Sequence, residues 1–259
     1  MVETQAANFE SSDMLRVFPT FVWKAQVAPG VRRRIEEDVL AKLDGMRGDT
    51  GEPAPGHGWQ SEKDLHHVDE FRSLVACIHD AAERVLEFLK IGDSAIEITG
   101  LWANINPKGA AHAVHSHPNN FLSGVYYVRA PEDANTVNFH DPRPQTGIIR
   151  PPVTELTAEN TDQVVVEVSD GTLLLFPSWL PHSVDASASD ETRISVSFNL
   201  MFPAYTETMS KPLWELKVAI GRGERGPGHL SVDRWFLFLG ATYRTAQSAQ
   251  RPLRVRNGP

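Results

Sequence analysis

The central part of the chain alternates between apolar and polar residues, which predicts β-strands because successive strand side chains point to opposite faces. Residues 96–106 and 193–199 carry this pattern most clearly. The residues expected on one face of each strand are Trp102, Asn104 and Asn106 on the first, and Arg193, Ser195, Ser197 and Asn199 on the second. Residues 124–128 and 171–177 are apolar and β-branched runs that suit buried strands. The pattern predicts a mainly β core.

Residues 31–46 and 70–89 instead carry apolar residues at helical spacing, so we expect two amphipathic helices that pack on the β core. A first strand is expected at residues 15–23, and residues 164–168 are expected to form a hairpin with residues 171–177. We predict one domain over residues 1–259. Its parts are an N-terminal strand with supporting helices (1–95), the β core (96–203) and a C-terminal extension without a recognisable motif (204–259).

The composition is that of an ordinary globular protein and narrows the functional classes. The chain has 259 residues, 41% of them hydrophobic and 22% charged, and a net charge of −8, which argues against nucleic-acid binding as the main function. Its one cysteine, Cys77, excludes an internal disulfide framework. No apolar run approaches the roughly 20 residues of a membrane span, and the N-terminus lacks the features of a signal peptide. We expect a cytoplasmic protein that does not bind membranes.

Three histidines, His112, His115 and His117, lie within six residues just before a predicted strand. Two residues apart on an extended chain, His115 and His117 point to the same side, whereas His112 is expected to point elsewhere or to lie in a loop. His182 follows the apolar strand at residues 171–177 and supplies a third imidazole. These residues form a candidate metal site with His112 outside it.

Arg193 is expected to face into the β core, where a charged side chain requires an anionic partner. Among rivals for the metal site, Asp141 could supply a carboxylate ligand, although its position before Pro142 favours a turn. Candidate substrate-contacting residues are Trp102, Asn104, Trp179 and Arg143.

In this order and spacing, the histidines and Arg193 resemble the Fe(II)/2-oxoglutarate-dependent oxygenases over about residues 98–203. The likeness is greatest to the prolyl-4-hydroxylase-like branch, and within it to a bacterial group with a His-x-His motif. It implies a double-stranded β-helix, or cupin-like jelly roll, with His115, His117 and His182 as ligands of Fe(II). It also implies that 2-oxoglutarate is the co-substrate and O2 the oxidant. The residues expected to bind 2-oxoglutarate are Arg193, Tyr127, Ser195 and Asn106.

His117 departs from the usual pattern of the superfamily, in which this position is a carboxylate. Three neutral ligands leave Fe(II) with its full charge until dianionic 2-oxoglutarate binds, and three histidines with an open position also describe a catalytic zinc site. The resemblance implies hydroxylation of an unactivated C–H bond in a small-molecule or peptide-like substrate, with succinate and CO2 as co-products. Alternatives are a cupin-type dioxygenase or zinc hydrolase that uses no 2-oxoglutarate, and a non-enzymatic metal-binding or ligand-binding protein. Residues 204–259 could cover the β core, form a homodimer contact or lie at the mouth of the substrate site.

Overall fold

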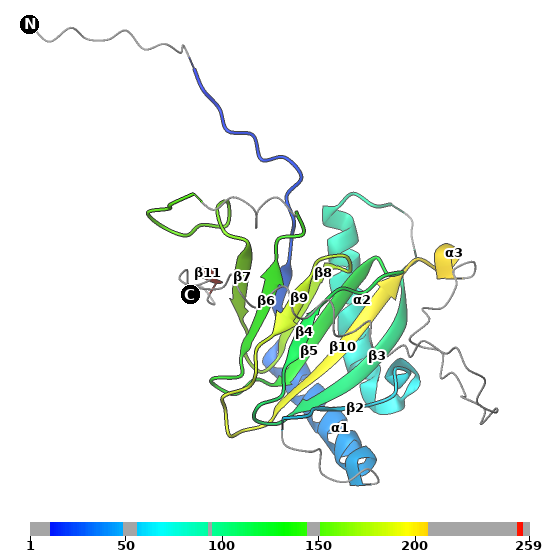
Figure 1. The fold of residues 1–259 in the computed structure, drawn as a ribbon. Coiled ribbons are helices and arrows are strands. Elements are labelled where there is room, and N and C mark those ends of the chain that lie inside the picture. The colour runs from blue at the N-terminus through cyan, green and yellow to red at the C-terminus, as the bar shows by residue number, and fades with distance from the viewer. Residues whose placement is uncertain (1–10, 49–55, 93–94, 144–150, 207–252, 256–259) are drawn as a thin grey trace, which may run out of the picture.

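The computed structural model describes residues 11–48, 56–92, 95–143, 151–206 and the backbone of 253–255. Within them the strands form two sheets that face each other (Figure 1). The larger sheet has the order β1 (Trp23–Gln26), β8 (Thr172–Pro177), β5 (Leu122–Arg129), β10 (Arg193–Met201), β3 (Glu97–Asn106) and β2 (Trp59–Gln60). The smaller sheet has the order β11 (Leu253–Val255), β7 (Gln163–Glu167), β6 (Thr136–His140), β9 (His182–Val184) and β4 (His112–His115).

The two sheets form the expected double-stranded β-helix. Neighbouring strands run antiparallel, except that β11 lies parallel to β7. The chain passes back and forth between the sheets, since β3 and β5 lie in the larger sheet whereas β4, between them in sequence, lies in the smaller one. Full antiparallel pairing of β10 with both β3 and β5 places the predicted strands at 96–106 and 193–199 at the centre of the larger sheet.

The expected helices cover the outer face of the larger sheet, as Figure 1 shows. They are α1 (Pro29–Gly48) and α2 (Arg72–Phe88), with two short 3-10 turns, η1 (Leu65–His67) and η2 (Asp69–Phe71), between them. Their buried residues join one apolar cluster with the odd-numbered residues of β3, Leu101, Ala103 and Ile105. The alternation of β3 is explained by this packing, because one face meets the helices and the other meets the smaller sheet. A further short helix, α3 (Pro203–Thr206), follows β10.

A second apolar cluster fills part of the space between the two sheets. It is built by Tyr127, Val137, Phe139, Val166, Val168, Leu174, Phe176 and Leu180. The neighbouring inward-facing positions of β3 and β10 are polar, so the inter-sheet space beside this cluster is lined by hydrogen-bonding groups instead of being closed by apolar side chains. This change in lining creates the cavity that holds the candidate site.

Two predictions about the strands were wrong. The first strand begins at Trp23, where the chain pairs with β8, and residues 15–22 form no strand. The segments β7 and β8 do not form a hairpin, because β7 pairs with β6 and β8 pairs with β5. Gly171, whose φ is +80°, helps to turn the chain from the smaller sheet to the larger one. The local sequence pattern predicted both strands, but their partners are set by pairing with the more distant strands β6 and β5.

The expectation for residues 204–259 falls mostly outside the described residues, and the division at residues 95 and 203 stays a prediction. None of the helices in the described parts of the chain is long and apolar enough to cross a membrane.

Candidate metal centre

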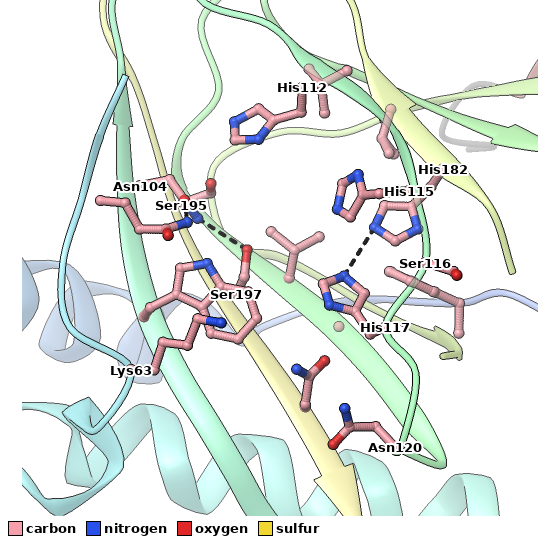
Figure 2. Close-up of a pocket in the computed structure, with 18 of the residues that line it drawn as sticks. Lys63, Asn104, His112, His115, Ser116, His117, Asn120, His182, Ser195 and Ser197 are labelled. Atoms are coloured by element: carbon pink, nitrogen blue, oxygen red, sulfur yellow. Dashed lines mark hydrogen bonds between the residues drawn. The ribbon is translucent and has the colours of Figure 1, made fainter. Parts of the chain in front are cut away.

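His115, His117 and His182 converge at one end of the smaller sheet (Figure 2). His115 ends β4 and His182 begins β9, and the antiparallel register places these two residues opposite each other. His117 follows two residues after His115, and its backbone N–H donates to the carbonyl of Ser178 at 2.8 Å. One ring nitrogen from each histidine lies within 4.8 Å of the others. The cluster combines one exposed, one half-buried and one buried imidazole and could hold a metal ion.

Backbone carbonyls fix which nitrogen of two rings is available to a metal. The Nδ1 of His115 lies 2.7 Å from the carbonyl of Ala113, and the Nδ1 of His182 lies 3.0 Å from the carbonyl of Leu180. Each Nδ1–H donates to its carbonyl, which leaves Nε2 with a free lone pair. The Nε2 atoms of His117 and His182 lie 3.3 Å apart. The rings are thus oriented as metal ligands are, with their free nitrogens directed at one another.

Burial keeps the rings of His117 and His182 neutral. It is the largest cause that lowers the pKa of His117 to about 3, followed by the charges of His182, His115 and Lys63. Burial likewise lowers the pKa of His182 to about 4, with a smaller contribution from His115. A neutral imidazole is the form that coordinates a metal, so no proton has to be removed from these two rings at neutral pH.

His112 faces the same cavity, which was not expected. It lies three residues before His115 in β4, and an uninterrupted strand would direct the two side chains to opposite faces. The register of β4 against β9 shifts between these residues, from His112 opposite Val184 to His115 opposite His182. This irregularity lets both rings line the cavity. His112 stays outside the three-histidine cluster, as predicted, and its Nε2 lies 3.4 Å from Oδ1 of Asn106.

The cavity beside the histidines has a volume of about 280 Å³. The larger sheet contributes a polar wall and the smaller sheet contributes the cluster of three histidines, with apolar side chains between them. The polar wall includes Trp102, Asn104, Arg193, Ser195 and Ser197, and the apolar lining includes Val125, Val137, Phe176 and Val184. No aspartate or glutamate occurs among the described residues that line this cavity.

Arg193 lines the same cavity as the histidines and is almost fully buried, with 2% of its surface exposed. Its Nε has no hydrogen-bond partner, and none of the ion pairs found among the described residues includes it. Burial lowers the pKa of Arg193, but a guanidinium stays charged in proteins. A buried cation without a carboxylate partner is costly, so this arrangement fits a site for an anionic ligand.

Tyr127 and Ser195 lie next to Arg193 on the cavity wall. Burial raises the pKa of Tyr127 to about 12, although Arg193 acts in the opposite direction, so the phenol stays protonated and can donate a hydrogen bond. Ser195 on β10 lies opposite Tyr127 on β5. Asn106 lies opposite Arg193 in the register of β3 and β10, and its Nδ2 is buried without a partner. The structure therefore gathers hydrogen-bond donors around the guanidinium.

Two predicted substrate contacts lie away from the cavity. Trp179 is in the turn between β8 and β9 with 55% of its surface exposed, and it does not line the cavity. Arg143 is paired with Asp141, with Nη2 2.6 Å from Oδ2, and does not line it either. Asp141 is absent from the histidine cluster, because this ion pair holds its carboxylate in the turn after β6.

The other two predicted substrate contacts, Trp102 and Asn104, do line the cavity. Asn104 Oδ1 accepts from Nε2 of Gln60 at 2.9 Å, and Asn104 Nδ2 donates to Oγ of Ser197 at 3.0 Å. Nζ of Lys63 lies 5.4 Å from the ring centroid of Trp102. Sequence reasoning missed Lys63 and Gln60, because they belong to no motif and reach the cavity only through the packing of their segment beside β3.

The fold and the site together define a class: a double-stranded β-helix with a cluster of three histidines and a buried cation in one cavity. Residues 100–199 match the family described as "Putative 2OG-Fe(II) oxygenase", so this part of the chain is similar to the 2-oxoglutarate/Fe(II) oxygenase superfamily. That superfamily implies Fe(II), 2-oxoglutarate and O2, and the cluster of three histidines is suited to the metal. A search of the curated proteins found no match.

Several solved structures share the fold. The epimerase SnoN from nogalamycin biosynthesis, described as non-heme and alpha ketoglutarate dependent, is 17% identical, with a TM-score of 0.51 over 70% of this chain and 78% of SnoN. A Pseudomonas putida prolyl-4-hydroxylase is 15% identical, with a TM-score of 0.50 over 70% of this chain and 92% of the hydroxylase. HygX from Streptomyces hygroscopicus, solved with nickel and 2-oxoglutarate bound, is 13% identical, with a TM-score of 0.50 over 70% and 83% of the two chains. These likenesses show the architecture.

Proposed function

We propose that this protein hydroxylates an unactivated C–H bond of a small-molecule or peptide-like substrate, using Fe(II), 2-oxoglutarate and O2 and releasing succinate and CO2. One observation carries the proposal: a buried arginine, without an acidic partner among the described residues, lies in the same cavity as a cluster of three histidines. A metal and a cation on either side of one cavity suit a ligand with two anionic ends. The match of residues 100–199 supports the same conclusion.

We assign His115, His117 and His182 as the residues that hold the metal. The imidazole donors suit Fe(II), and three protein ligands leave other coordination positions for the co-substrate. With neutral ligands only, Fe(II) keeps a charge of +2, which a bound 2-oxoglutarate dianion balances. With a carboxylate in place of His117, the net charge of the iron, its protein ligands and bound 2-oxoglutarate would be −1. The third imidazole should therefore strengthen the binding of 2-oxoglutarate.

We assign Arg193 as the partner of the far carboxylate of 2-oxoglutarate. Its planar guanidinium can donate to both carboxylate oxygens at once. Tyr127 would donate its phenolic hydrogen to the same group, with Ser195 and Asn106 as further hydrogen-bonding neighbours. The buried, unsatisfied atoms Nε of Arg193 and Nδ2 of Asn106 agree with this role, because a carboxylate at this position would give them acceptors.

When bound, iron and 2-oxoglutarate would activate O2, the oxidant that is needed to hydroxylate a strong C–H bond. The contribution of the chain itself is to orient both ligands and to limit water in the cavity. Val125, Val137, Phe176 and Val184 give the lining its apolar part. Trp102 and Asn104 belong to the opposite wall and would contact the substrate.

The proposal is tested by whether catalysis requires 2-oxoglutarate. Protein loaded with Fe(II) should convert 2-oxoglutarate to succinate in the presence of O2, and candidate substrates should accelerate this conversion. Arg193→Ala should retain iron but need far more 2-oxoglutarate, whereas the control Arg143→Ala, outside the cavity, should behave as the wild type.

A ligand set of three imidazoles also favours a second candidate, a metal enzyme of the same fold that uses no 2-oxoglutarate. A cupin-type dioxygenase would consume O2 with its own substrate when 2-oxoglutarate is absent, and a zinc hydrolase would act with Zn(II) and without O2. Either result would contradict the proposed function.

A further inference from the structure

His112 is the histidine of the cavity that the proposed metal site does not use. It lines the cavity but stays outside the cluster of three histidines, and Figure 2 shows it apart from them. Its Nε2 lies 3.4 Å from Oδ1 of Asn106, at the long end of the hydrogen-bonding range. Because an amide oxygen can only accept, Nε2 of His112 must carry the hydrogen and donate it. His112 is therefore directed at Asn106 through its ring N–H group.

The backbone of Gly58 closes the same side of Asn106. Gly58 comes directly before β2, and the pairing of Trp59 with Ile105 brings it alongside Asn106. A Cβ at position 58 would lie 2.3 Å from Oδ1 and 3.4 Å from Cγ of Asn106, too close for any real side chain. The amide oxygen of Asn106 is thus held between the ring of His112 and a residue without a side chain.

The nitrogen of the same amide lacks an acceptor. Asn106 is 2% exposed, and its Nδ2 has no hydrogen-bond partner among the described residues. Asn106 lies opposite Arg193 in the register of β3 and β10, and Nε of Arg193 is likewise buried without a partner. A buried donor without an acceptor is costly, and here two of them are neighbours. One carboxylate between them would give both an acceptor.

Holding the oxygen of a planar amide also aims its nitrogen. The carbonyl and amino groups of Asn106 lie in one plane, so rotation about χ2 moves both together. The contacts of Oδ1 with His112 and Gly58 therefore direct Nδ2 although neither residue touches it. Without the donor of His112, the amide could rotate, and a ligand would have to fix its orientation on binding at a cost in entropy.

We propose that His112 is a positioning residue for the co-substrate: by donating to Oδ1 of Asn106, it directs Nδ2 of Asn106 at the carboxylate that Arg193 binds. The assignment rests on the proposed function, because it takes that carboxylate to be the far end of 2-oxoglutarate. In this arrangement His112 contacts neither the metal nor 2-oxoglutarate and acts only through Asn106. Gly58 supports the same orientation from the backbone.

The test measures 2-oxoglutarate binding by calorimetry, with the full chain loaded with Fe(II) and kept under argon. Asn106→Ala removes the donor itself and should weaken binding by about 10-fold or more, the size expected for a hydrogen bond to a charged group. His112→Phe keeps a ring but removes the N–H group, and it should weaken binding by about 3- to 10-fold. His112→Gln places an amide N–H near the position of Nε2 and should restore most of the affinity. All three proteins should retain stoichiometric iron.

Further variants separate positioning from a general structural effect. In a protein that already carries Asn106→Ala, His112→Phe should cost no further affinity, because the group that it positions is gone. Gly58→Ala removes no polar group but crowds Oδ1 of Asn106, so it should also weaken 2-oxoglutarate binding. The matched control is His140→Phe, since Nε2 of His140 lies 2.8 Å from Oγ of Ser183 and His140 does not line the cavity. The control should bind 2-oxoglutarate as the wild type does.

Three results would overturn the assignment. They are wild-type affinity in His112→Phe, equal losses in His112→Phe and His112→Gln, and a cost of His112→Phe that is undiminished when Asn106 is already alanine. The same titrations separate this inference from the proposed function. A wild type that binds no 2-oxoglutarate contradicts both, whereas a wild type and a His112→Phe protein that bind it equally contradict only the role of His112.

Discussion

Replacing Arg193 by methionine should stabilise the metal-free fold and at the same time abolish tight binding of 2-oxoglutarate. Arg193 is 2% exposed and has no acidic partner among the described residues, so solvent does not weaken the electrostatic interactions of its charge. Removing one partner of a buried charge pair costs about 2–5 kcal/mol, or about 30- to several-thousand-fold in affinity. Without ligand, loss of a buried unpaired charge should add about 1–2 kcal/mol to the free energy of unfolding, or about 2–8 °C in Tm.

The two effects are measured by thermal unfolding of the metal-free protein and by anaerobic calorimetry of 2-oxoglutarate with the Fe(II)-loaded protein. Arg193→Lys should lose less affinity than Arg193→Met, because lysine keeps the charge without the planar pair of donors. The matched control is Arg129→Met on β5, since Arg129 contacts Glu36 at 3.4 Å and Asp170 at 3.5 Å. The control should lower Tm and leave 2-oxoglutarate binding intact. A lower Tm for Arg193→Met together with wild-type affinity would refute the reasoning.

Three further predictions follow from particular residues. His117→Ala should lose stoichiometric iron while His112→Ala retains it, because only His117 belongs to the cluster; metal analysis of both proteins checks this, and the reverse pattern would show the ligand assignment to be wrong. Burial is the largest cause that lowers the pKa of His112 to about 4, and the charge of Arg193 is the second. An unfolded histidine has a pKa of roughly 6.5. As the pH falls from roughly 6.5 to about 4, His112 therefore gains a proton in the unfolded chain but not in the folded protein. Urea unfolding of metal-free protein should therefore show that the wild type loses about 3 kcal/mol more than His112→Asn between pH 7 and pH 4; parallel losses would contradict this. Gly124→Ala should destabilise the fold by about 1–3 kcal/mol, because the added Cβ would lie 2.2 Å from Cζ of Phe198 and 2.5 Å from the carbonyl oxygen of Leu174, and an unchanged Tm would contradict it.

The faces of the central strands could be predicted because one face packs against apolar side chains and the other faces the polar part of the space between the sheets. Residues 101, 103 and 105 of β3 meet the helices and residues 102, 104 and 106 are turned away from them, as the alternation indicated. The same rule placed Arg193, Ser195 and Ser197 on the cavity side of β10. The spacing of His115, His117 and His182 within the expected fold was enough to predict their clustering.

Features that depend on distant segments could not be predicted from the local pattern. The register shift between His112 and His115 arises from pairing with β9, which lies some 70 residues later in the chain. The hairpin predicted for residues 164–177 does not form for the same reason, because β7 pairs within the smaller sheet and β8 pairs within the larger sheet. Lys63 reaches the cavity only because its backbone joins Leu101, a contact without a sequence signature.

The most direct test of the central claim is a crystal structure grown under argon with Fe(II) and 2-oxoglutarate. The account predicts one iron bound by His115, His117 and His182, and one dicarboxylate that joins the iron at one end and the guanidinium of Arg193 at the other. An iron bound elsewhere, or a dicarboxylate whose far end does not contact Arg193, would contradict it.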